Sequence, residues 1–161
     1  MKHRTGYTIT LLLLLSGLFI GSTPPSDSVG LSKGQTVYVS VYSNILTAPR
    51  GIPFSLEATL IIRNTDMTNT LKVSTADFYN TEGKVIKQFV ESAMILKPLE
   101  TRYIYLPEKG TEGGLGANFI IRWSADRAIN APIVECLMIG ARSSQGISFI
   151  SPGKVIEEHS R

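Results

Sequence analysis

The chain has one cysteine, two histidines and few charged residues, and these shortages exclude several classes of protein. One cysteine among 161 residues cannot form an internal disulfide or supply a cysteine-rich zinc site. Charged residues make up 18% of the chain and hydrophobic residues 43%, which is not the composition of a disordered acidic or basic protein. The length suits one folded domain. Ser–His and Cys–His mechanisms need a usable histidine, so both are disfavoured.

The beginning of the chain has the pattern of a secretory leader. Lys2 and Arg4 give a basic start, residues 7–20 are almost wholly apolar, and small or rigid residues follow at 21–25. This order predicts a signal helix over residues 1–22 that is cleaved on export. The alternative is an uncleaved signal anchor, although the apolar stretch is shorter than the roughly 20 residues of a spanning helix.

The leader decides where the protein is expected to act. An exported chain of this kind is predicted to be extracytoplasmic, in the periplasm, and tethering to the inner membrane through an uncleaved leader is the alternative. Loss of residues 1–22 removes Lys2 and Arg4, which lowers the formal net charge from +3 to +1. The other basic residues are scattered, so no nucleic-acid partner is expected, and membrane contact is expected only through the leader.

The rest of the chain is organised as short strands separated by turns. Residues 23–35 are rich in Pro, Ser and Gly and predict a linker, residues 36–156 a folded domain, and residues 157–161 a polar tail. Apolar residues alternate with polar ones, most clearly over 54–63, and no segment after the linker has a 3.6-residue period. The pattern predicts an all-β antiparallel β-sandwich with Ig-like architecture. Another β-sandwich or a small barrel is the alternative.

The alternation also predicts which side chains fill the core. Cys136 lies in an apolar run and is interpreted as a buried small hydrophobe rather than a reactive thiol. The predicted inward set is Val39, Leu56, Leu60, Ile62, Phe119, Ile121, Trp123, Leu137 and Ile139.

Acidic side chains are the remaining source of chemistry. Asp66, Asp77 and Glu82 lie near predicted turns, and Glu108 and Glu112 flank or enter a glycine-rich loop. No calcium-loop spacing brings them together, and we expect them to be solvated turn residues. No catalytic residue, metal site or cofactor is therefore predicted.

The glycine-rich loop over residues 110–116 is the most unusual feature. Consecutive glycines can expose backbone N–H groups that bind an anion, but a phosphate-binding loop needs a following helix, and a strand pattern follows here. A flexible or tightly turned connection is the favoured interpretation. Ser143–Gln145 is either a polar loop that touches a partner or an ordinary turn. The candidate binding residues are Gly113, Gly114, Gly116, Asn118, Arg122 and Gln145.

Two stretches are the most distinctive parts of a wider resemblance. They are Gly113-Gly114-Leu115-Gly116-Ala117-Asn118-Phe119 and Gln145-Gly146-Ile147-Ser148-Phe149. Similar stretches lie at residues 34–43, 62–66, 78–84, 132–135 and 153–156, with Trp123. On these residues the chain resembles, over 34–156, the bacterial exported family of the domain of unknown function 3124. The resemblance implies a secreted or periplasmic β-rich domain, often behind a lipoprotein leader, and no activity. This chain lacks the lipoprotein cysteine.

The leading hypothesis is an uncharacterised exported protein that acts as a non-catalytic binding or structural module of the bacterial cell envelope. Its partner would be an envelope protein or a small ligand. Two alternatives remain: a carboxylate-dependent envelope enzyme acting on a glycan, and a chaperone-like, stress-protective envelope module. Facing carboxyl groups about 5–9.5 Å apart favour the first alternative. An exposed sheet edge or an apolar groove favours the second.

Overall fold

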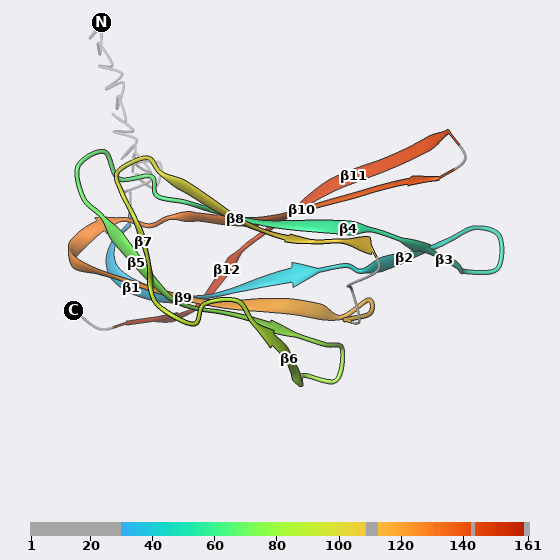
Figure 1. Ribbon diagram of the computed structural model, residues 1–161, viewed down its shortest axis with the longest axis horizontal. Helices are drawn as coiled ribbons and strands as arrows, with labels where there is room; N and C mark the ends of the chain where they lie inside the picture. Colours follow the sequence, from blue (N-terminus) through green and yellow to red (C-terminus); the bar gives the residue numbers. More distant parts are fainter. Residues whose placement is uncertain (1–29, 109–112, 143, 160–161) are drawn as a thin grey trace, which may run out of the picture.

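A computed structural model describes residues 30–108, 113–142 and 144–159. This part of the chain is all-β, and every strand pairing in it is antiparallel (Figure 1). None of its elements is a helix long and apolar enough to cross a membrane. The signal helix predicted over residues 1–22 and the linker residues 23–29 lie outside the described ranges. The strands are β1 Leu31–Val41, β2 Asn44–Thr47, β3 Ile52–Ser55, β4 Glu57–Arg63, β5 Leu71–Tyr79, β6 Val85–Gln88, β7 Met94–Leu96, β8 Thr101–Leu106, β9 Ala117–Asn130, β10 Ile133–Arg142, β11 Gln145–Pro152 and β12 Lys154–Glu158.

The strands form two main sheets that lie as two layers in Figure 1. The six-stranded sheet has the order β12–β1–β9–β5–β6, with β7 paired to β5. The four-stranded sheet has the order β11–β10–β4–β8, and β2 and β3 form a separate hairpin. Neighbours within each main sheet are mostly distant in sequence, so the chain crosses repeatedly between the layers and holds them together.

The first strand begins inside the predicted linker. β1 starts at Leu31, where it pairs with Asn130 of β9, and Ser32 pairs with Ile129. The Ser32 hydroxyl also donates a hydrogen bond to the C=O of Gly34 and accepts one from the N–H of the same residue. Pairing with a distant strand thus overrides the loop-like composition of residues 31–35.

The clearest alternating segment is a pair of strands rather than one. Residues 54–63 divide at Leu56, which lies between β3 and β4 and whose N–H donates to the C=O of Ser43, the residue just before β2, at 2.9 Å. The alternation itself is confirmed, because Leu56, Ala58, Leu60 and Ile62 are all buried. The chain thus leaves β3, which pairs with β2, and enters β4, which pairs with β10 and β8, without changing which face is inward.

Side chains from both main sheets pack into a single core cluster. Seven of the nine predicted core residues are buried, including Phe119 and Trp123. The prediction is wrong for Leu137 and Ile139, which point away from the core, and Ile139 is 45% exposed. β10 pairs Cys136 with the inward Leu60, and residues opposite each other in an antiparallel pair share a face. The side chains of β10 that face the core are therefore those of Val134, Cys136 and Met138.

Cys136 is buried as expected, and desolvation raises the pKa of its thiol to about 12. The thiolate is the reactive form of cysteine, so this burial keeps the side chain unreactive near neutral pH.

The chain passes from one main sheet to the other at Gly153. Its N–H donates to the C=O of Val134 at 2.8 Å, and a Cβ at this position would lie 2.7 Å from both that oxygen and Val37 Cγ1. Only glycine leaves room for this approach. Beyond it β12 pairs with β1 and continues through Glu157 and Glu158, the first residues of the predicted polar tail.

Candidate functional site

The described part of the glycine-rich loop is held by two residues from other parts of the chain. The C=O of Gly113 accepts hydrogen bonds from the N–H and the hydroxyl of Thr81, at 2.9 and 2.8 Å. The same hydroxyl accepts from the N–H of Gly116 at 3.1 Å, and the N–H of Ser43 donates to the C=O of Gly114. Gly114 has a φ of 78°, which suits glycine.

These contacts describe a tight connection rather than an anion cradle. The Gly116 amide is used by Thr81, and a Cβ on Gly113 would lie 2.4 Å from that of Ala117. Residues 109–112, which include Glu112, lie outside the described ranges. Thr81 lies in the turn between β5 and β6, and its hydroxyl closes a loop more than 30 residues away, a contact that the local sequence does not indicate.

The six candidate binding residues do not form one site. Asn118 and Arg122 lie on β9 and face outward from the six-stranded sheet, where Arg122 stands between Thr36 and Thr75. Gln145 begins β11 in the other main sheet, opposite Arg142 at the tip of the β10–β11 hairpin (Figure 1). The glycines border only Asn118, since β9 begins at Ala117.

The turn between β4 and β5 is built around a buried acid. Asp66 is 7% exposed, so the expectation of a solvated side chain is wrong here, and Asp77 within β5 is equally buried. Asp66 Oδ1 accepts from the N–H groups of Thr68 and Asn69 and from both of their side chains. The Thr68 and Asn69 amides lower the pKa of Asp66 from 3.8 to about 2. A short turn with a central carboxylate is an Asx-type motif that the residue types allow.

The Asp66 carboxylate makes the stability of the fold depend on pH between its ordinary pKa of 3.8 and its lowered pKa of about 2. The lowered pKa means that Asp66 stabilises the fold fully above its ordinary pKa of 3.8, and that this contribution is lost as pH falls to about 2. We expect Asp66→Asn to lower the Tm by several degrees at pH 7, and the gap to the wild type to close between about pH 4 and 2. Thermal unfolding at pH 7, 4 and 2 measures this difference in Tm. The control is Asp126→Asn, because Asp126 is an exposed acid of β9. A gap that stays constant with pH contradicts the assignment.

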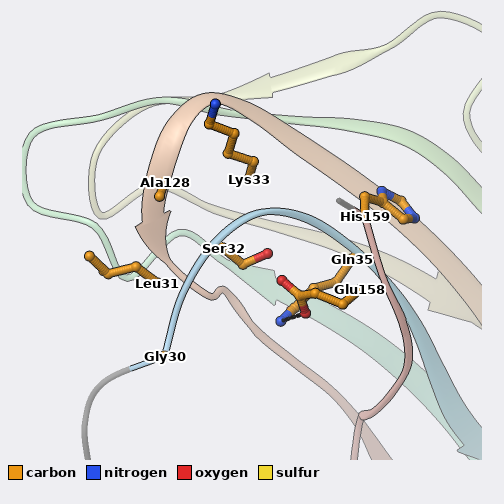
Figure 2. A pocket seen from close by; sticks show the side chains of 8 residues that line it. All are labelled: Gly30, Leu31, Ser32, Lys33, Gln35, Ala128, Glu158 and His159. Atoms are coloured by element: carbon orange, nitrogen blue, oxygen red, sulfur yellow. Dashed lines mark hydrogen bonds between the residues drawn. The ribbon is translucent and has the colours of Figure 1, made fainter. Parts of the chain in front are cut away.

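A pocket of about 540 Å³ lies where the start of β1 meets the end of β12 (Figure 2). Its size falls within the roughly 300–1,000 Å³ of small-ligand sites. Gln35 and Glu158 lie side by side in it, and the Gln35 amide donates to the carboxylate at 2.8 Å. The complete lining is Gly30, Leu31, Ser32, Lys33, Gln35, Ala128, Glu158 and His159.

His159 is fixed beside this pocket by β1. Its N–H donates to the C=O of Gly34 at 2.9 Å, and its Nε2 lies 2.9 Å from the Thr36 hydroxyl. That hydroxyl donates a hydrogen bond to Glu157 at 3.1 Å. Since its one hydrogen is used there, the Nε2–H of His159 must be the donor in the bond between His159 and Thr36. A histidine that donates to the hydroxyl does not activate it as a base, and the three side chains join β12 to β1.

Two acidic side chains share a smaller hollow at one end of the four-stranded sheet. Glu57 and Glu108 both line a space of about 140 Å³, below the usual size of a ligand pocket. An adjoining space of about 390 Å³ is lined by Phe54, Ser55, Glu108 and Ala141 and adds no second acid. The Tyr105 hydroxyl donates to Glu57, which raises the pKa of the tyrosine. Within the described ranges, no three His, Cys, Asp or Glu side chains are grouped to hold a metal ion.

Fold and site together define an all-β protein of antiparallel sheets with an open pocket beside β1 and β12. The chain belongs to the family described as Protein of unknown function (DUF3124), whose model matches residues 34–156. No curated protein matches the chain. A crystal structure of Thermotoga maritima 1070 is 14% identical, with a TM-score of 0.46, and the alignment covers 78% of this chain and 97% of that chain.

Proposed function

We propose that this protein is an exported, non-catalytic binding module of the bacterial cell envelope, and that the pocket beside β1 and β12 binds an envelope protein segment or a small ligand. The observation that carries the proposal is the pocket itself, which combines ligand-sized volume with a few polar groups. Lys33, Gln35 and Glu158 supply charge and hydrogen-bonding capacity, and Leu31 supplies apolar surface. The basic and apolar pattern of residues 1–22 supports export to the periplasm, or tethering to the inner membrane through an uncleaved leader.

The test is site-specific photo-crosslinking in living bacteria, followed by fractionation. A photoreactive amino acid in place of Lys33 is expected to give a discrete adduct in the extracytoplasmic fraction, identified by mass spectrometry. The matched control replaces Lys84, an exposed lysine in the β5–β6 turn. The proposal fails if both positions give the same adducts, if neither gives any, or if the protein is found in the cytosol.

The proposal includes an Ig-like arrangement of the two main sheets. The chain passes repeatedly between them: β4 lies in the four-stranded sheet, β5 to β7 in the six-stranded sheet, β8 in the four-stranded sheet and β9 in the six-stranded sheet. Greek-key connections of this kind are typical of Ig-like sandwiches. An experimental structure in which the strands of the two sheets cross near a right angle would contradict it.

The glycan-enzyme alternative has weaker support than binding. Glu57 and Glu108 are the acids that share a hollow, and that hollow is small. Glu157 and Glu158 each accept a hydrogen bond from a side chain of β1, which gives both a structural role. The chaperone-like alternative needs an accessible sheet edge or apolar face that can accept a segment of a client protein.

A further inference from the structure

The outward face of the four-stranded sheet is unusually apolar. An antiparallel sheet that covers a core on one side normally presents polar residues on the other. In the six-stranded sheet the central strand β9 follows this rule, with Asn118 and Arg122 among its outward residues. The exposed apolar side chains of that sheet lie mainly on its edge strands β6, β7 and β12. The four-stranded sheet does not follow it. Its outward residues include Tyr103 at 72%, Ile150 at 57%, Tyr105 and Ile133 at 49% and Ile139 at 45% exposure.

These side chains form continuous rows across the four strands. The pairings align Tyr105, Thr59, Leu137 and Ile150 in one row. They align Tyr103, Ile61, Glu135 and Pro152 in the next. A contiguous exposed patch of this kind marks an interaction surface more often than scattered single residues do. We call the outward face of the four-stranded sheet, including these two rows, the outer tyrosine face.

The charged outward residues of β4 have opposite signs at the two ends of the strand, and Glu135 of β10, which contacts Arg63, lies between those ends. Glu57 and Arg63 lie at the two ends of β4 on the outward side, equally far from Leu60. Ile139 stands opposite Glu57 and Ile133 opposite Arg63, so β10 carries matching apolar residues at the same two ends. Tyr103 and Tyr105 flank the same midpoint on β8.

We propose that the outer tyrosine face binds a second copy of this chain in a two-fold dimer. An axis that crosses β4 at Leu60, perpendicular to the strands and in the plane of contact, brings Glu57 of one copy opposite Arg63 of the other. It also brings Tyr103 opposite Tyr105 and Ile133 opposite Ile139. An isologous interface requires a surface that complements itself in this way. An axis parallel to the strands instead leaves Glu57 in the same row as Glu57 of the second copy.

The Arg63 side chain can take part without losing its contact within the chain. Its Nε lies 3.5 Å from Glu135 Oε1, and a guanidinium has four further N–H donors for a second carboxylate. Four strands at about 4.8 Å spacing and seven residues at about 3.3 Å each give a projected face of roughly 450 Å². Two such faces bury about 900 Å² in total, which is below the roughly 1,200–2,000 Å² of standard stable interfaces, so the dimer is weak and depends on concentration.

Sedimentation velocity over a wide concentration range tests the dimer, using the protein as processed and purified from cells. Glu57→Lys and Arg63→Glu are each expected to abolish dimerisation, because each places like charges opposite one another. Their equimolar mixture is expected to form a heterodimer, because both cross-interface pairs are then of opposite charge. Both residues are exposed, and unchanged circular dichroism and Tm confirm that each variant is folded.

Tyr103→Glu provides a test that does not depend on the charge pairs. It is expected to weaken association at least about tenfold, since it places a charge among apolar side chains, opposite Tyr105 of the second copy. Ile156→Glu is the matched control, because Ile156 is 55% exposed on β12 in the other main sheet. A wild type that is monomeric at every concentration overturns the proposal, as does a mixture no more dimeric than its components. Capture of a different protein through Tyr103 by a monomeric wild type would assign the face to a heteromeric partner instead.

Discussion

Replacing Trp123 by alanine is expected to lower the free energy of unfolding by about 3–5 kcal/mol and the Tm by about 10 °C. Trp123 is 1% exposed and lies at the centre of β9, between Gln35 of β1 and Val73 of β5. Removing the indole leaves a large cavity in the core that the surrounding strands cannot fill. Urea denaturation with a two-state fit measures the change, and a loss below about 1 kcal/mol contradicts this role.

Trp123→Phe separates packing from polarity at the same position. The indole Nε1 is buried and has no hydrogen-bond partner within the described part of the chain. An unpaired buried donor costs about 1–3 kcal/mol, so its removal offsets part of the volume that phenylalanine lacks. The phenylalanine variant is therefore expected to lose less than half of what the alanine variant loses. Equal losses would mean that the N–H has a partner.

Periodicity predicted strands and faces wherever one side of a strand is clearly more apolar than the other. In β4 and the first part of β9 the outward residues are polar apart from Ile61 and Ile120, and the inward residues, such as Leu60 and Phe119, were assigned correctly. β10 is apolar on both sides because its outward residues belong to the outer tyrosine face. Alternation therefore could not identify its inward side, and pairing with β4 decides it.

The candidate site was less accessible to sequence reasoning because its contacts join distant residues. Gln35 and Glu158 are 123 positions apart and meet only because β12 pairs with β1. The last residues of the chain read as a polar tail because residues 157–161 are all polar. The glycine-rich loop is evident from its composition. Nothing in the sequence around Thr81 indicates that this residue holds the loop.

Replacing Asn64 by alanine is expected to cost about 3 kcal/mol. Asn64 is 2% exposed, and its Nδ2 donates to the C=O groups of Asn69 at 2.8 Å, Lys97 at 2.9 Å and Leu96 at 3.3 Å. Its Oδ1 accepts from the N–H of Asp66 at 3.0 Å. Each lost hydrogen bond contributes about 1 kcal/mol, and the carbonyls left behind are partly or fully buried. Urea denaturation measures the loss, with Asn44→Ala at the start of β2 as the matched control.

Asn64→Asp tests whether the side chain acts through its N–H groups. The substitution keeps size and the acceptor for Asp66, but at neutral pH it places a carboxylate oxygen against three carbonyl oxygens. A buried charge facing only acceptors costs more than a missing group, so this variant is expected to be less stable than Asn64→Ala. Wild-type stability in Asn64→Asp would show that the amide does not donate there. The expected order places Asn64 as the residue that joins the β4–β5 turn to the segment after β7, a link between positions about 33 residues apart.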